Sequence, residues 1–249
     1  MLTKSQIALL NGLHQVKNRY QEKLFLVEGY KTIEMLQKSD YKVVQYFATV
    51  DFDSDRISIP HDSIKEVTTA ELQKLSGFKN PQPVFALVQM PEAKVFAPIG
   101  APLLVLDGIS DPGNLGTIIR LAHWFGIKQI LANDHTVDVY NPKVIQSAMG
   151  SSFFIDIHYT DLTTALHLLK LESYQCIATA MNGLPIQSFN LPSKAAILIG
   201  NEANGISEQL LQLCDQTIAI PNFSEGVAPE SLNAAVTAGI VMAKLKMVL

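Results

Sequence analysis

The stretch Leu106-Asp-Gly-Ile-Ser-Asp-Pro-Gly-Asn-Leu-Gly-Thr-Ile-Ile-Arg120 is the most informative part of this chain, because it contains a strand end, a tight loop and the start of a helix. Arg120 is the only Lys, Arg, Asp or Glu between Asp111 and Lys128. Its neighbours along the helix are largely apolar, and burying a charge without a partner is costly. We therefore expect Arg120, at a place where a core would hold an aliphatic side chain, to have a functional role or a dedicated partner.

Strand-like apolar runs alternate with helical patterns around this stretch, which predicts an α/β protein with a parallel sheet covered on both faces. A Pro- and Gly-rich linker at 93–101 separates a small α/β domain at 1–92 from a larger domain at 102–249. In the small domain we expect strands at 24–27, 43–48 and 84–90 and helices at 30–36 and 70–75. In the larger domain we expect strands at 103–106, 129–132, 153–157, 175–179, 196–199 and 217–220, and helices at 115–125, 142–149, 162–171, 208–213 and 232–245.

Three unusual loops follow strands of the larger domain, and ligands bind at the carboxyl ends of strands in such sheets. The first loop contains Asn114, which is well placed to be the N-cap of the next helix. The second loop, 199–207, has Glu202 as its only acid. The third loop, 220–233, leads into an apolar last helix that starts near Ser231, which is either its N-cap or a functional residue. Taken alone, each loop is also compatible with a plain connection between a strand and a helix.

Composition and charge argue against several classes of protein. The net charge of −4 argues against indiscriminate nucleic-acid binding. No apolar run approaches the roughly 20 residues that span a bilayer, and we expect neither a membrane partner nor a secretory signal. Cys176 and Cys214 form no CxxC pattern, the histidines show no metal spacing, and the GxGxxG fingerprint of a standard dinucleotide fold is missing. A reducing, cytoplasmic location without a bound metal is expected.

Basic residues gather near the N-terminus, where Lys4, Lys17, Arg19 and Lys23 accompany a single acid, Glu22. Such a cluster is typical either of a solvated helix end or of a surface that contacts nucleic-acid phosphates. Charge alone leaves both interpretations open.

In their order along the chain, the three loops resemble the motifs of the SpoU (TrmH-like) RNA 2′-O-ribose methyltransferases of the SPOUT superfamily. The first motif is similar to Asn114-Leu-Gly through Arg120, the second to Gly200-Asn-Glu-Ala-Asn-Gly205, and the third to Ile220-Pro with Ser231-Leu-Asn233. The stretch from Lys17 to Gly29 is similar to the substrate-binding domain often fused in front of that catalytic domain. The resemblance covers nearly the whole chain, and one departure from it is a longer loop before Ser231.

This resemblance implies a homodimer whose catalytic domain has a deep C-terminal trefoil knot and binds S-adenosylmethionine in a bent form. It implies methyl transfer to a ribose 2′-hydroxyl of RNA, and the added N-terminal domain favours ribosomal RNA. The implied catalytic and substrate-orienting residues are Asn114, Arg120, Glu202, Ser231 and Asn233. The implied cofactor contacts are Thr179, Ala180, Gly200, Ile220 and Leu232, and the implied RNA contacts are Lys17, Arg19, Lys23 and Lys31.

The role of Arg120 stays open at this point. In this family the arginine is proposed as the base that takes the 2′-hydroxyl proton, but a guanidinium with a pKa above about 12 is a poor base. Arg120 can instead hold the adjacent phosphate or stabilise alkoxide character. Three other functions also stay open: methylation of transfer RNA, RNA binding without catalysis on the same fold, and nucleotide-dependent oxidoreduction, against which the missing glycine fingerprint argues.

Overall fold

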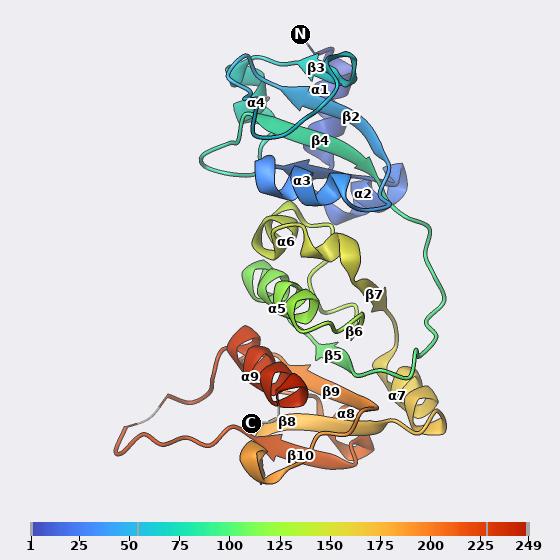
Figure 1. The fold of residues 1–249 in the computed structure, drawn as a ribbon, viewed down its shortest axis with the longest axis vertical. Helices are drawn as coiled ribbons and strands as arrows, with labels where there is room; N and C mark the ends of the chain where they lie inside the picture. The colour runs from blue at the N-terminus through green and yellow to red at the C-terminus, as the bar shows by residue number, and fades with distance from the viewer. Residues whose placement is uncertain (1, 54, 228, 248–249) are drawn as a thin grey trace. The chain divides into compact units, whose positions relative to one another are not determined.

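A computed structural model of the chain describes residues 2–53, 55–227 and 229–247 (Figure 1). The chain divides into two compact units. The first unit contains the residues up to Ala93 together with Asp138–Phe153, and the second contains Lys94–Val137 and the residues from Phe154 onward. The segment Asp138–Phe153, which lies within 102–249 in the sequence, thus packs with the N-terminal residues. None of the helices in the described ranges is long and apolar enough to cross a membrane.

The second unit is built on a parallel sheet that has six strands in the described part of the chain, in the order β10-β8-β9-β5-β6-β7. All neighbouring strands pair in parallel, so the predicted α/β fold with a parallel sheet is confirmed. Because the strands run the same way, the loops after β5, β8, β9 and β10 emerge at one edge of the sheet. The strands are β5 (Leu103–Asp107), β6 (Gln129–Ala132), β7 (Asp156–Tyr159), β8 (Gln175–Pro185), β9 (Ala195–Gly200) and β10 (Gln216–Ala219).

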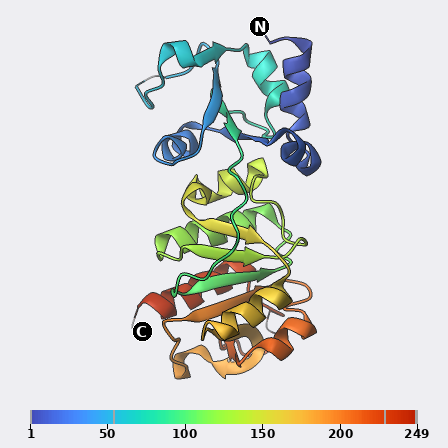
Figure 2. The same ribbon diagram turned by 90° about the vertical axis from the view of Figure 1, so that its right-hand side faces the viewer.

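Helices cover both faces of this sheet (Figures 1 and 2). Alternate strand residues such as Leu103 and Val105 point to one face and pack with α7 (Leu162–Leu171) and α8 (Glu208–Leu213). On the opposite face lie α5 (Pro112–Trp124) and α9 (Ala234–Lys246), which contact each other. A Cβ atom on Gly239 of α9 would lie only 3.3 Å from Leu121 Cδ1 of α5, so small residues let these two helices approach closely.

The strand predicted at 153–157 is misplaced. Met149 and Gly150 both have positive φ angles, and Ser151–Phe154 then forms a short 3₁₀ helix, so β7 starts only at Asp156. The strand predicted at 175–179 continues to Pro185, because its second half pairs with β10 after a shift in register. The apolar runs at both places are buried or paired as expected, and only their local geometry differs.

The first unit contains a mixed four-stranded sheet in the order β1-β4-β2-β3, counted over the described residues. The strand β4 pairs antiparallel with β1 and β2, and β3 pairs parallel with β2. The apolar pattern of the sequence did not predict α1, α2 and β3, because these elements are short and only partly apolar. The strands are β1 (Leu24–Glu28), β2 (Val43–Ala48), β3 (Ile64–Glu66) and β4 (Val84–Gln89), and the helices are α1 (Lys4–Gly12), α2 (Val16–Glu22), α3 (Tyr30–Gln37), α4 (Thr69–Leu75) and α6 (Pro142–Ala148).

Candidate active site

A cavity of about 590 Å³ opens where the loops after β8, β9 and β10 meet in the second unit. Its volume lies within the range of small-molecule sites. All five residues expected to contact the cofactor line it, and so do two of the expected catalytic residues. These seven residues are Thr179, Ala180, Gly200, Glu202, Ile220, Ser231 and Leu232. Three segments that are far apart in the sequence therefore form one concave site.

A chain of hydrogen bonds joins three of the expected catalytic side chains. Asn114 Nδ2 donates to Glu202 Oε1, and Asn233 Nδ2 donates to Asn114 Oδ1 over 2.8 Å. Asn233 Oδ1 in turn accepts from the backbone N–H groups of Ala235 and Val236 at the start of α9. Each amide is thus held by both its donor and its acceptor. This chain places the three loops of the sequence motifs in direct contact.

Two predicted helix caps are wrong, and the corrections explain this arrangement. Asp111, rather than Asn114, caps α5: its Oδ1 atom accepts from the Asn114 backbone N–H over 2.8 Å. Asn233, rather than Ser231, caps α9. Because Asp111 satisfies the first turn of α5, the Asn114 side chain is left to bond Glu202 and Asn233.

Arg120 lies on the exposed side of α5, so the expectation that its charge is buried is wrong. Its neighbours Ile118, Ile119 and Ala122 are fully buried and carry the apolar face of the helix. Arg120 follows Asn114 by six residues, about 9 Å along the helix axis. Within the described residues it makes neither a hydrogen bond nor an ion pair and does not line the cavity. Its guanidinium is therefore available to a ligand or to a second chain.

The loop after β9 has a tight backbone that depends on two glycines. Asn201 and Gly205 exchange two backbone hydrogen bonds, of 3.1 and 2.8 Å. A Cβ atom on Gly200 would lie 2.3 Å from the Gly205 carbonyl carbon, so no other residue fits at position 200 without displacing the loop. Gly205 has a φ of 66°, in the left-handed region that favours glycine. The loop presents Glu202 to the cavity in this closed conformation.

Asn201, which the sequence pattern did not single out as a site residue, connects two of the loops. Its Nδ2 atom donates to Gly108 O over 2.8 Å, and its Oδ1 atom accepts from the Ala203 backbone N–H. An asparagine directly after a buried strand is a weak signal, because such residues are also common in ordinary turns. Only the three-dimensional arrangement shows that its partner belongs to the loop after β5.

The predicted RNA contact at Arg19 is wrong. The Arg19 side chain is buried in the first unit and forms an ion pair with Asp138. Its Nη1 atom also donates to Leu13 O and His14 O, over 2.8 and 3.0 Å. The expected contacts Lys17, Lys23 and Lys31 are all exposed. A charge cluster in the sequence cannot distinguish a lysine in solvent from an arginine that has found a buried carboxylate.

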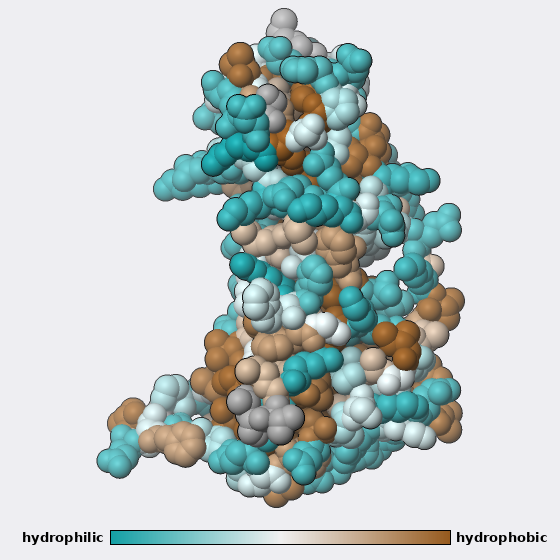
Figure 3. Space-filling model, viewed as in Figure 1, coloured by the Kyte–Doolittle hydropathy of each residue, from teal (hydrophilic) through white to brown (hydrophobic). Residues whose placement is uncertain are grey.

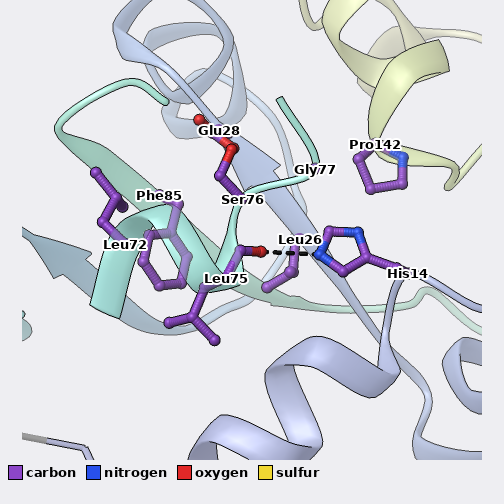
Figure 4. A pocket seen from close by; sticks show the side chains of 9 residues that line it. All are labelled: His14, Leu26, Glu28, Leu72, Leu75, Ser76, Gly77, Phe85 and Pro142. Atoms are coloured by element: carbon purple, nitrogen blue, oxygen red, sulfur yellow. Dashed lines mark hydrogen bonds between the residues drawn. The ribbon is translucent and has the colours of Figure 1, made fainter. Parts of the chain in front are cut away.

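The first unit has a second, much smaller cavity of about 10 Å³ beside His14 and Glu28 (Figure 4). This is room for about one water molecule, too little for a substrate. His14 Nε2 donates to Leu75 O over 2.8 Å. Burial raises the pKa of Glu28, while hydrogen bonds from Ser76 and Gln82 oppose the shift. These groups hold α4 and its flanking loop against β1.

Comparisons with known proteins agree with this architecture. The model of the SpoU rRNA methylase family matches residues 101–243, and that of the MRM3-like substrate binding domain matches residues 4–86. A relative from Bacillus subtilis, the 23S rRNA (guanosine(2553)-2′-O)-methyltransferase RlmP, is 32% identical over 94% of this chain and 93% of its own. The sequence similarity thus extends over both units.

Solved structures share the whole fold. A TrmH-family protein from Porphyromonas gingivalis superposes with a TM-score of 0.88, at 28% identity and 100% coverage of both chains. The SpoU methyltransferase AviRb from Streptomyces viridochromogenes, solved with its cofactor AdoMet, superposes with a TM-score of 0.84 at 22% identity, over 98% of this chain and 97% of AviRb. The family match and the shared fold define an S-adenosylmethionine-dependent methyltransferase of the SPOUT type. The chain belongs to the SpoU rRNA methylase family, whose members methylate the 2′-oxygen of ribose in RNA.

The cavity suits S-adenosylmethionine in size and in charge. Apolar side chains, among them Ile199, Ile220 and Leu232, offer surfaces for a nucleoside ring. Among the described lining residues there is no Lys or Arg, whereas Glu202 and Glu230 each contribute a carboxylate. A cavity with this balance of charge is compatible with a cationic sulfonium.

Proposed function

We propose that this enzyme methylates a ribose 2′-hydroxyl of ribosomal RNA and that Asn114, Glu202 and Asn233, with Ser231 and Arg120, form its catalytic and substrate-orienting set. The observation that carries this proposal is the hydrogen-bonded chain of Asn114, Glu202 and Asn233 at the cavity. The relative from Bacillus subtilis, named for a 23S rRNA methylation, supports ribosomal RNA as the substrate class. Holding two reacting atoms in line can contribute roughly 7–11 kcal/mol to catalysis.

The proposal assigns cofactor binding to the cavity residues Thr179, Ala180, Gly200, Ile220 and Leu232. S-adenosylmethionine supplies an electrophilic methyl group on a positively charged sulfur. Around it, the chain's own residues exclude water from the apolar part of the cavity and keep a carboxylate near the positive charge. The tight turn from Gly200 to Gly205 holds that wall of the cavity in place.

For Arg120 we propose contact with the phosphate next to the target ribose or with the 2′-oxygen as its proton leaves. A free guanidinium supports this role, since Arg binds phosphate through several parallel N–H donors. A guanidinium stays protonated in proteins and is a poor base, which makes electrostatic stabilisation the better supported of the two chemistries.

We propose that the enzyme is a homodimer formed through α9 and α5. Val236 and Ile240 are 49% and 37% exposed, one turn apart on α9, and Leu232 just before the helix is 44% exposed. Figure 3 shows hydrophobic side chains gathered over α9. Trp124, at the end of the adjoining helix α5, is 84% exposed. A contiguous apolar stripe of this kind on a helix is typical of a protein interface.

The proposal also includes the deep trefoil knot that the family resemblance implies. The path of the chain supports it: β10 pairs with β8, and the chain then returns to the other side of the sheet, where α9 packs on α5 and β9.

A substitution such as Val236→Glu tests the dimer, because it should produce monomers in size-exclusion chromatography with light scattering. An unchanged mass would contradict the proposed interface.

We propose that RNA phosphates contact the first unit at Lys17, Lys23 and Lys31. Their exposure supports this role, as does the match to a substrate-binding domain. Binding should weaken steeply with salt, and charge removal at all three lysines should flatten that dependence. Equal binding of the triple Ala variant and the wild type across salt concentrations would contradict this role.

We also propose a cytoplasmic location, where the two free cysteines stay reduced.

The experiment that tests the function is mapping of 2′-O-methyl sites in RNA from cells with and without this protein. A single ribosomal site lost in the deletion and restored by the wild type, but not by Glu202→Gln, is the expected result. If a transfer-RNA site is lost instead, the substrate is transfer RNA and not ribosomal RNA. Restoration by both forms would favour an RNA-binding protein that needs no catalysis.

A further inference from the structure

Asp107, the last residue of β5, is a buried carboxylate that the proposed chemistry does not use. Its side chain accepts two hydrogen bonds from different segments: Asn133 Nδ2 donates to Oδ1 and the Ser207 backbone N–H donates to Oδ2, each over 2.7 Å. The residue is only 9% exposed. No ion pair involves it among the residues that the structure describes, so neutral donors alone surround its charge.

One of these two bonds reaches the loop that carries Glu202, and the other reaches the loop after β6. Ser207 ends the loop that holds Glu202, and Asn133 follows β6 on the other side of β5. Asn133 Oδ1 accepts from the Gly108 backbone N–H over 3.0 Å, and Asn201 Nδ2 donates to Gly108 O. The loop that leads to Asn114 is therefore held at both the N–H and the carbonyl group of its first residue, Gly108.

The arrangement uses the two oxygens of a carboxylate in a way that an amide cannot reproduce. At position 107, an asparagine side chain would direct an N–H group either at the Ser207 N–H or at the Asn133 amide, and one donor would then face another. A buried donor left without an acceptor shifts until it finds one. Such a shift would separate Glu202 from Asn114, whose bond depends on the same two loops.

We infer that Asp107 is a positioning residue for methyl transfer, because it fixes the loop of Glu202 relative to the loop of Asn114. The inference rests on the proposed function of those two residues. It concerns the rate of the chemical step, since the Asp107 carboxylate lies behind the loops and does not line the cavity. Its loss should therefore reduce the rate of transfer and leave cofactor affinity close to that of the wild type.

The structure offers a reciprocal exchange as the test, in which Asp107→Asn is combined with Asn133→Asp. The new amide at position 107 can accept from the Ser207 N–H through its oxygen and can donate to the new carboxylate at position 133. That carboxylate also accepts from the Gly108 N–H. Every donor again has an acceptor and the net charge is unchanged. In contrast, Asp107→Asn alone leaves two donors facing each other, and Asn133→Asp alone leaves two carboxylates facing each other.

We would measure single-turnover methyl transfer at saturating RNA and cofactor, the calorimetric Kd for S-adenosylmethionine, and the melting temperature. Each single variant should slow transfer by about 10²-fold, the loss typical of small misplacements, with the Kd changed only a few-fold. The double variant should recover most of the rate. Asp156→Asn, which removes an exposed carboxylate from the same unit, is the control and should match the wild type.

Full transfer rate in Asp107→Asn would overturn the inference. The inference would also be overturned if the transfer rate fell only in proportion to a weaker Kd for S-adenosylmethionine. A double variant that transfers as slowly as the single variants would overturn it too. If the charge variants do not fold, Asn133→Ala still removes one donor to Asp107 and must slow transfer. The proposed function is tested separately, because full activity of Asn114→Ala would disprove the catalytic assignment whatever happens at position 107.

Discussion

Asn114 in the first turn of α5 donates a hydrogen bond to the carboxylate of Glu202, which is 88 positions further along the chain. Asn233 extends this pair through its own bond to Asn114. The bond spans two loops of the parallel sheet, so its geometry depends on the packing of the whole second unit.

Asn114→Ala and Glu202→Gln should each lower the single-turnover rate of methyl transfer by about 10²-fold or more, because the first removes the donor to Glu202 and the second removes the negative charge at the cavity. The melting temperature should change little, since Asn114 is only half-buried. Transfer of a labelled methyl group to total RNA measures the rate. Variants that keep the wild-type rate would show that the pair is merely structural.

Arg120→Ala should remove most turnover and leave both stability and cofactor affinity nearly unchanged. The side chain is exposed and makes neither a hydrogen bond nor an ion pair within the described residues that its loss would break. Calorimetry with S-adenosylmethionine and thermal unfolding provide the two controls. A drop of only a few-fold in the single-turnover rate would contradict the assignment of Arg120 to the reaction.

Gly200→Ala should abolish cofactor binding while the protein stays folded. The new Cβ atom would lie 2.3 Å from the Gly205 carbonyl carbon, and the loop would have to move out of the cavity wall. Gly205→Asn is the matched control: position 205 has a positive φ that Asn tolerates, and nothing lies within 4 Å of an added Cβ atom. Wild-type affinity of the Gly200→Ala variant, measured by calorimetry, would show that the tight turn is unimportant.

Asp138→Ala should destabilise the protein by about 3–5 kcal/mol, because it leaves the buried Arg19 guanidinium without its carboxylate. Tyr20 also donates its hydroxyl to Asp138, and burial and this carboxylate raise the tyrosine's pKa. Urea unfolding measures the loss. Lys17→Ala, a substitution at an exposed position of the helix that carries Arg19, should change stability by less than about 0.5 kcal/mol. A similar cost for both substitutions would contradict a buried ion pair.

Thiol titration should reveal two unreactive cysteines. Burial raises the pKa of Cys176 to about 11, and burial with the nearby Cys176 and Asp215 raises that of Cys214 to about 12. Both thiols should react slowly with Ellman's reagent at pH 8 in the native state and rapidly in urea. Fast native reaction at pH 8 would contradict the packing at β8 and after α8.

The raised pKa values of the two thiols also predict how the stability of the protein depends on pH. The folded state holds the thiol protons more tightly than the unfolded chain, whose thiols titrate near pH 8.5. The stabilising contribution should be complete below that pH and be lost as pH rises toward 11 and 12. Urea midpoints of the wild type and of Cys176→Ala, compared at pH 8 and pH 10, should converge at the higher pH. A constant difference would contradict the shift.

The sequence by itself determined the alternation of strands and helices, because side-chain periodicity reports directly which face of an element is apolar. The strand Gln129–Ala132 and the helix Leu162–Leu171 begin and end at the predicted residues. The three loops could be placed at one edge of the sheet, since parallel strands bring their carboxyl ends together. Local patterns were sufficient for these conclusions.

Only the tertiary structure decided which side chains become partners. Asn114 is not a cap because Asp111 takes that role, and Arg19 is not an RNA contact because Asp138, 119 positions away, takes its charge. The exposure of Arg120 depends on which face of α5 the sheet covers. Hydrogen bonds and ion pairs between distant residues carry no periodic signal, so they become visible only when packing has brought the segments together.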